Sequence, residues 1–156
     1  MQARINYAKA APGVYKTMLG VHEYLENCGL EPELMNLVWL RASQINHCAY
    51  CVDMHWKDLR AAGAPEQKLY MLNAWREWAG YSGRERAALE WTEAVTLLTE
   101  GFVPDEVYRV AREQFNEREL SNLTLAIIAI NGWNRLNVAF RMPAGTYQPA
   151  TASMPA

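Results

Sequence analysis

The sequence of residues 40–55 reads LRASQINHCAYCVDMH and places two cysteines and a histidine at helical spacing. Cys48, Cys51 and His55 occupy positions i, i+3 and i+7, which lie along one face of an α-helix. We expect this helix to cover about residues 48–62 and to end at a glycine. The two thiols and the imidazole therefore come from one helix and face the same way.

This spacing predicts a redox-active dithiol. Two cysteines three residues apart at a helix start can bring their Cα atoms within the roughly 4.4–6.8 Å that a disulfide requires. The thiolate is the reactive form, and a helix N-terminus favours the anion. An imidazole one turn away can take the proton and pair with the thiolate. Since His55 is one turn from Cys51 and two turns from Cys48, we predict Cys51 as the nucleophile, Cys48 as the resolving thiol and His55 as the general base.

Other uses of these side chains are open at this point. Free cysteines can simply pack as small apolar groups. Zinc could be held by Cys48, Cys51 and His55 with His47 or water as the fourth ligand, although the sequence has no second CxxC and no HxxxH. Haem attachment needs a histidine directly after the second cysteine, where Val52 stands, and a thioredoxin-like domain needs βαβ units. We therefore predict no metal and no cofactor.

The rest of the chain is helical by pattern, because apolar residues recur at helical spacing and no stretch alternates like a strand. Proline, glycine and capping signals divide it into helices expected around residues 14–28, from 32, over 48–62, from 65, over 82–101, from 104 and over 116–140. We predict an all-α, single-domain bundle of about six to seven helices. Residues 1–148 are expected to form the helical redox domain and residues 149–156 a mobile C-terminal tail.

Composition narrows the class of protein. With 156 residues, 51% of them hydrophobic and 21% charged, the chain suits one soluble domain. A formal net charge of −2 gives no basic footprint for nucleic acid or an anionic membrane. The most hydrophobic run, residues 123–130, is far shorter than the ~20 residues of a membrane-spanning helix. We recognise no signal peptide in the first twenty residues. Three cysteines do not suggest a secreted disulfide framework, so we expect a cytoplasmic protein.

The remaining candidate side chains have weaker signals. Cys28 is expected to be a buried structural thiol and His22 a structural histidine. His47 could tune the site or lie exposed in a loop. Six tryptophans and eight tyrosines fit a thick core and a surface between subunits equally well.

Residues 40–55 closely resemble the core motif of the alkylhydroperoxidase D-like proteins, which belong to the carboxymuconolactone decarboxylase superfamily. Residues 84–94 and 123–135 are similar to further stretches of that family. The resemblance implies an all-helical fold, homo-oligomers (often trimers or hexamers) and a peroxidase cycle. In that cycle Cys51 attacks a hydroperoxide and becomes a sulfenic acid, Cys48 condenses with it to a disulfide, and an external thiol or dithiol reductant resets the pair.

One position departs from the family pattern. The family usually has a glutamate twelve residues before the first motif cysteine, in a proton relay with the histidine, and this chain has Asn36 there. An amide can orient a water or the imidazole, yet it cannot accept a proton at neutral pH. Glu33, one turn earlier, or Glu85 or Glu93 from elsewhere, could supply the carboxylate. Without one, His55 lacks its partner and the nucleophile should be less ionised.

We therefore predict a thiol-dependent peroxidase that acts through Cys48 and Cys51 with His55 as general base. The alternative is a redox-sensing or disulfide-reductase protein with weak peroxide turnover, because Asn36 replaces the relay glutamate. A third possibility is a non-redox enzyme of the superfamily that acts on a small lactone or acid, with the cysteines incidental. The identity of the hydroperoxide, the reductant and the oligomer size are open.

Overall fold

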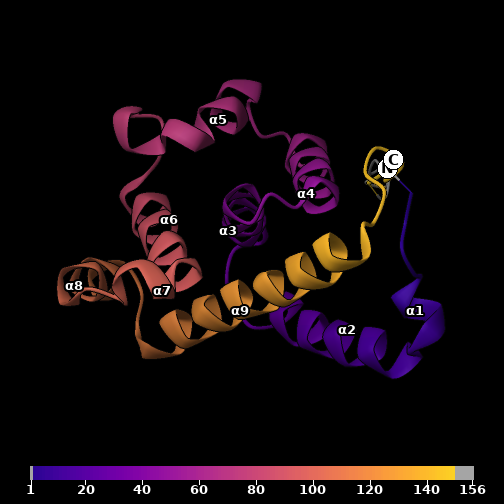
Figure 1. Ribbon diagram of the computed structural model, residues 1–156. Helices are drawn as coiled ribbons and strands as arrows, with labels where there is room; N and C mark the ends of the chain where they lie inside the picture. Colours follow the sequence, from indigo (N-terminus) through magenta and orange to yellow (C-terminus); the bar gives the residue numbers. More distant parts are fainter. Residues whose placement is uncertain (1, 150–156) are drawn as a thin grey trace, which may run out of the picture.

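The computed structural model describes residues 2–149 as an all-α protein (Figure 1). In chain order the helices are α1 (Tyr7–Ala10), α2 (Pro12–Glu26), α3 (Pro32–Ile45), α4 (Ala49–Ala61), α5 (Glu66–Tyr70), the 3₁₀ helix η1 (Met71–Glu77), α6 (Gly83–Thr96), α7 (Leu98–Gly101), α8 (Asp105–Gln114) and α9 (Glu117–Phe140). No β-strand occurs within these residues. The predicted all-α fold is confirmed.

Helix α3 is the centre of the fold. Figure 1 shows it nearly end-on, with α4, α5, α6 and α9 around it. Leu37 and Leu40 face one apolar cluster, which includes side chains of α4, α5, η1 and α6. Met35, Val38 and Ala42 face a second cluster, built with α2, α6, α8 and α9. A helix that is apolar on several sides is buried rather than amphipathic, which explains the dense apolar run in its sequence.

Local capping signals set where two of the long helices begin. Ser82 Oγ accepts from the Glu85 amide at 3.2 Å, and the Glu85 carboxylate accepts from the Ser82 amide at 2.8 Å. Asn116 and Glu119 form the same reciprocal pair at the start of α9, with both distances 2.9 Å. Each N-cap contributes about 1 kcal/mol to stability. The starts of α6 and α9 expected from the sequence are confirmed.

The seven expected helices correspond to α2, α3, α4, α5, α6, α8 and α9, and the described chain adds α1, η1 and α7. α1 is a single turn that stops before Pro12, because proline disfavours helical geometry in the residue that precedes it. The helix expected over 82–101 is interrupted at Leu97, whose ψ of 35° leaves the helical range. It becomes α6 followed by the short α7.

The two ends of the described chain return to the same side of the bundle. The Arg4 amide donates to the Phe140 carbonyl at 2.9 Å, so the N-terminal arm lies against the end of α9. Tyr147 donates from its hydroxyl to Asp58 Oδ1 at 2.7 Å and so joins the segment after α9 to α4. Of the predicted tail, residues 149–156, only Pro149 lies within the described residues. No helix of residues 2–149 is long and apolar enough to cross a bilayer.

Candidate active site

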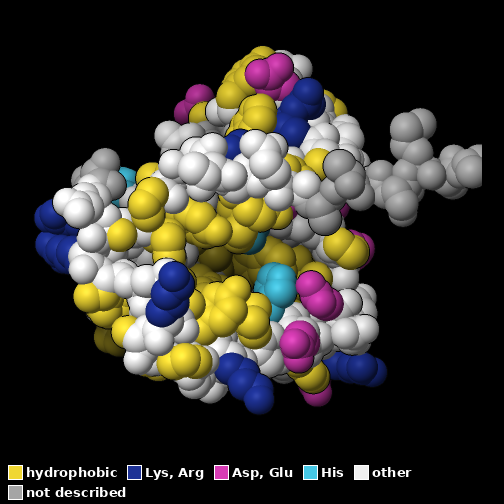
Figure 2. Space-filling model, turned by 90° about the vertical axis from the view of Figure 1, so that its right-hand side faces the viewer, with side chains coloured by type: hydrophobic (Ala, Val, Ile, Leu, Met, Phe, Trp, Pro, Cys, Tyr) yellow, Lys and Arg dark blue, Asp and Glu magenta, His cyan; other side chains and the backbone are white. Residues whose placement is uncertain are grey.

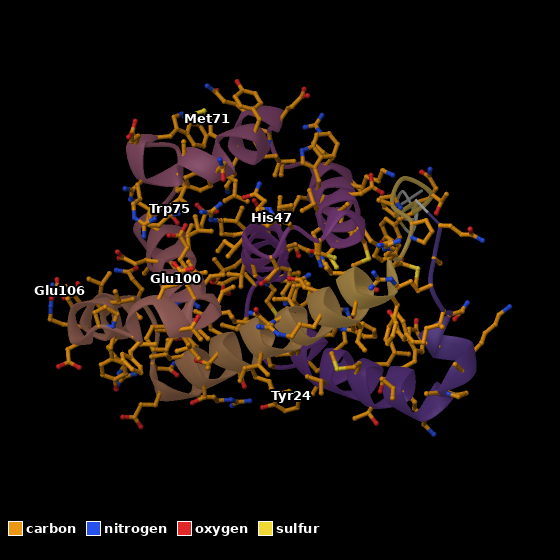
Figure 3. The ribbon with its side chains drawn as sticks, viewed as in Figure 1. Tyr24, His47, Met71, Trp75, Glu100 and Glu106 are labelled. Atoms are coloured by element: carbon orange, nitrogen blue, oxygen red, sulfur yellow. The ribbon has the colours of Figure 1, made fainter. Side chains whose placement is uncertain are left out.

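A tight turn sets the first cysteine at the start of α4. His47 adopts a positive φ of 54°, and Cys48 is the extended N-cap residue (φ −86°, ψ 94°). Asn46 anchors the turn to α9 by donating to Oδ1 of Asn131 at 3.0 Å and of Asn134 at 2.9 Å. The His47 side chain is exposed at the end of α3 (Figure 3). Cys48 therefore sits where unpaired helix amides and the positive end of the dipole favour an anion.

The two motif cysteines lie together in the interior. Cys48 Sγ donates to Cys51 Sγ at 2.8 Å, and both residues are free thiols with 1% of their surface exposed. Cys28, in the loop after α2, is a third free thiol and is buried, as expected. The pair therefore has the proximity that a dithiol–disulfide cycle requires.

An asparagine of α9 completes the surroundings of the second sulfur. Asn137 Nδ2 donates to Cys51 Sγ at 3.2 Å, and Asn137 Oδ1 accepts from the Tyr7 hydroxyl at 2.9 Å. Sequence reasoning missed both residues. A signal existed, since Asn131, Asn134 and Asn137 recur every three residues in an apolar helix and two of them are buried. Buried amides are kept where their hydrogen bonds are made.

The two thiols hold their protons very differently. The hydrogen bond with Cys51 lowers the pKa of the Cys48 thiol to about 7, against the opposing effect of burial. The hydrogen bond with Cys48, followed by burial, raises the pKa of the Cys51 thiol. Because the sulfurs share a proton, these values describe the pair: the first proton leaves easily and the second is held. A single negative charge on the pair is therefore accessible near neutral pH.

His55 is buried, with 3% of its surface exposed, and its ring is fixed by α3. Its Nδ1 lies 3.1 Å from Asn36 Oδ1, and the Asn36 amide nitrogen donates to the Pro32 carbonyl at 3.2 Å. This arrangement leaves the Asn36 oxygen as an acceptor, so His55 carries its proton on Nδ1 and a lone pair on Nε2. His55 Nε2 has no hydrogen-bond partner in the described part of the chain.

Burial, with a smaller effect of His22, lowers the pKa of His55 from 6.5 to about 3. The ring lies between aromatic neighbours, 5.3 Å from the Trp39 ring centroid, and Trp39 in turn is 5.0 Å from His22. The imidazole is therefore neutral at physiological pH. A lasting imidazolium–thiolate pair, as the sequence reasoning envisaged, would have to overcome this cost of burying a charge.

The carboxylates considered as replacements for the relay glutamate are engaged elsewhere. Glu33 is half-exposed and pairs with Lys68 at 3.2 Å. Glu85 caps α6 and also pairs with Lys68, at 2.5 Å. Glu93 accepts from Arg41 and Trp75. Within residues 2–149, the hydrogen-bond partner of His55 is thus the amide of Asn36.

A cavity of about 370 Å³ opens beside Cys51 and His55. Figure 2 shows this face hollowed, with hydrophobic side chains in the hollow and histidine at its edge. Aromatic rings dominate its wall: Tyr7, Tyr15, Trp39, Tyr50 and Trp133. Among the described residues, no Asp, Glu, Lys or Arg lines it. Cys51 reaches this wall and Cys48 does not, so a ligand in the cavity meets Cys51 first.

A second cavity of about 430 Å³ shares His22, Trp39, Met54 and His55 with the first. It is more polar, because Asn36 and Asp58 also line it. No group of three or more His, Cys, Asp or Glu side chains in the described ranges is arranged to hold a metal ion. The zinc alternative weighed from the sequence has no such ligand cluster to support it.

Comparisons with known proteins agree with the geometry. The model of the carboxymuconolactone decarboxylase family matches residues 12–94. YdfG, an uncharacterised protein of Bacillus subtilis (strain 168), is 40% identical over 139 residues, which are 89% of this chain and 95% of that protein. A crystal structure of a protein of unknown function from Agrobacterium tumefaciens, described as a candidate antioxidant defence protein AhpD, is 42% identical. It has a TM-score of 0.90, with 94% of this chain and 100% of that chain covered.

A second solved structure shares the fold at much lower identity. It is an uncharacterised peroxidase-related protein from Ralstonia eutropha JMP134, described as an alkylhydroperoxidase AhpD core. Its TM-score is 0.78 at 19% identity, with 89% of this chain and 74% of that chain covered.

Proposed function

This chain belongs to the carboxymuconolactone decarboxylase family and is alkylhydroperoxidase D-like, and from that premise we propose that it is a thiol-dependent peroxidase. It reduces hydroperoxides through a dithiol–disulfide cycle of Cys48 and Cys51, with His55 as general base. The observation that carries the proposal is the pair of free sulfurs 2.8 Å apart, of which Cys51 borders an apolar cavity.

The proposed cycle conserves atoms and charge. The dithiol loses one proton, and the remaining proton moves to Cys48, which leaves Cys51 as the thiolate. That thiolate attacks the terminal oxygen of the hydroperoxide, the O–O bond breaks, and Cys51 becomes a sulfenic acid while an alkoxide leaves and is protonated to the alcohol. Cys48, as a thiolate, then attacks the Cys51 sulfur, and hydroxide leaves as water. Two thiols and one hydroperoxide give a disulfide, an alcohol and water.

In this proposal His55 moves protons within the cavity rather than carrying a permanent charge. Its Nε2 lone pair is held available because Asn36 accepts from Nδ1. A neutral imidazole can take the thiol proton transiently and return it to the leaving alkoxide. His55 therefore serves as acid and base in turn.

The cavity favours a hydroperoxide with an apolar body. Its aromatic wall, as far as the structure describes the chain, offers no charged group for a polar substrate, and about 370 Å³ is within the size range of small-molecule sites. An external thiol or dithiol resets the disulfide. We place the protein in the cytoplasm, where thiols are kept reduced, and propose that it is a homo-oligomer, such as a trimer or hexamer.

A peroxide-consumption assay with cumene hydroperoxide and dithiothreitol tests the function. We expect Cys51→Ser to abolish turnover and Cys48→Ser to leave a sulfenic acid that dimedone traps on Cys51. Cys28→Ser is the matched control, because this thiol is buried outside the cavity wall, and it should turn over like the wild type. Normal turnover in Cys51→Ser would end the proposal.

A redox sensor or disulfide reductase is the second candidate. It is favoured by the neutral amide at position 36, since Asn36 cannot supply the negative charge that would raise the basicity of His55. The two candidates separate in a steady-state assay. Slow peroxide turnover, together with a disulfide that forms readily and changes the oligomeric state, would favour the sensor.

A further inference from the structure

Asn137 is held at both ends by hydrogen bonds that aim its amide at a sulfur. It lies on α9 with 5% of its surface exposed. Its Oδ1 accepts from the Tyr7 hydroxyl at 2.9 Å, and its Nδ2 is 3.2 Å from Cys51 Sγ. Since a phenol hydroxyl donates to the oxygen, the nitrogen must face the sulfur.

The hydroxyl of Tyr7 keeps its proton and so remains the donor to Asn137 Oδ1. Burial, followed by the nearby Cys51, raises the pKa of Tyr7 to about 12, so its proton stays in place at physiological pH. The ring is buried and packs against Phe140, with ring centroids 5.8 Å apart. The N-terminal turn α1 therefore contributes directly to the orientation of the Asn137 amide.

Cys51 Sγ accepts two hydrogen bonds, one from Asn137 Nδ2 and one from Cys48 Sγ at 2.8 Å. A neutral thiol is a weak acceptor, whereas a thiolate accepts strongly, and hydrogen bonds to a charged partner are roughly twice as strong. The N-cap position by itself favours a charge on Cys48. Asn137 lowers the pKa of both thiols, but its direct hydrogen bond at 3.2 Å is to Cys51. This donor opposes the effect of the bond between the two sulfurs and favours the other distribution, with the proton on Cys48 and the charge on the sulfur that borders the cavity.

No positively charged side chain in the described part of the site stabilises a thiolate on Cys51. The cavity wall has no Lys or Arg, and buried His55 is neutral at physiological pH. Among residues 2–149, the His55 ring hydrogen-bonds to Asn36 rather than to a sulfur. The anion must therefore be stabilised by neutral donors.

We propose that Asn137 is a catalytic residue that selects Cys51 as the attacking thiolate, and that Tyr7 is the positioning residue that aims the Asn137 amide. The proposal rests on the peroxidase function above for the reaction it serves. Its physical content is the ionisation of Cys51, which can be measured without any peroxide.

The test is the rate of Cys51 alkylation by iodoacetamide as a function of pH, followed by fragment-ion mass spectrometry that distinguishes Cys51 from Cys48. Asn137→Leu removes the donor and keeps a side chain of similar size. We expect its alkylation midpoint to rise by about 1 to 2 pH units, the effect of one lost hydrogen bond to a charged group. Tyr7→Phe keeps the ring and should raise the midpoint less, because the amide can then reorient.

A matched control exists on the neighbouring helices. Tyr24 of α2 (Figure 3) donates to Asn122 Oδ1 at 3.0 Å, the same tyrosine–asparagine pairing to α9 at a distance from the sulfurs. Tyr24→Phe should leave the Cys51 midpoint unchanged.

Circular dichroism establishes that each variant is folded. A wild-type midpoint in folded Asn137→Leu would overturn the proposal, and if that variant does not fold, a wild-type midpoint in Tyr7→Phe would overturn it instead. A midpoint that rises as expected in a protein without peroxide turnover would support the role of Asn137 while rejecting the peroxidase function. The two ideas therefore fail separately.

Discussion

Acid should destabilise this protein through the burial of His55. The pKa of His55 falls from 6.5 to about 3 on folding, because the ring is removed from water. As the pH drops below 6.5, the unfolded chain takes up a proton on this ring, and the folded chain does so only near pH 3. The folded protein therefore keeps its full stability above pH 6.5 and loses stability as the pH falls from 6.5 towards 3. Between pH 7 and pH 4.5 this one group costs about 2 to 3 kcal/mol.

The comparison that isolates this effect is urea unfolding of the wild type and of His55→Gln at pH 7.0 and pH 4.5. Glutamine is neutral at both values, and its amide can donate to Asn36 in place of Nδ1. We expect the wild type to lose about 2 to 3 kcal/mol more than His55→Gln between the two pH values. Other titrating groups are common to both proteins and cancel in this difference.

His47→Gln is the matched control, because the His47 side chain is already exposed in the folded protein. It should lose as much stability on acidification as the wild type. If His55→Gln also loses as much as the wild type, burial of a neutral imidazole does not describe the folded state, and the tautomer derived for the site would have to be abandoned.

Two further predictions concern the hydrogen bond of His55 and the cavity beside Cys51. Asn36→Asp places a carboxylate of the same shape against His55 Nδ1. We expect the pKa of His55, measured by imidazole NMR, to rise from about 3 by roughly 1 to 3 units, and peroxide turnover to increase. An unchanged pKa of His55 would contradict the contact between the two side chains. Leu19 lines the cavity beside Cys51, and Leu19→Trp fills part of that cavity. We expect kcat/KM to fall about tenfold or more for cumene hydroperoxide and to change little for hydrogen peroxide. Equal losses for both substrates would show that the cavity does not hold the organic group.

Much of the fold was predictable because its signals are local. The capping box of Ser82 and Glu85 and the Asn116–Glu119 pair each act over three residues, so the sequence alone predicts where α6 and α9 begin. The positive φ of Gly63 ends α4 where expected. The break at Leu97 carried no such signal, since no proline or glycine stands there.

The motif cysteines were predictable for the same reason. Cys48 and Cys51 are one turn apart, so their proximity follows from helix geometry alone. The exact chemistry at each sulfur does not, because it depends on which sulfur borders the cavity and which receives a donor.

The sequence by itself determined the seven main helices, the spacing of the two cysteines and the histidine, and the missing carboxylate at Asn36. Only the tertiary structure decided that Asn36 fixes the tautomer of His55, that Asn137 donates to Cys51 and that Tyr7 donates to Asn137. The physical reason is the separation of these residues along the chain. Asn137 is 86 residues from Cys51 and 130 residues from Tyr7. No local sequence pattern predicts these contacts, because they form only when α1, α4 and α9 pack together.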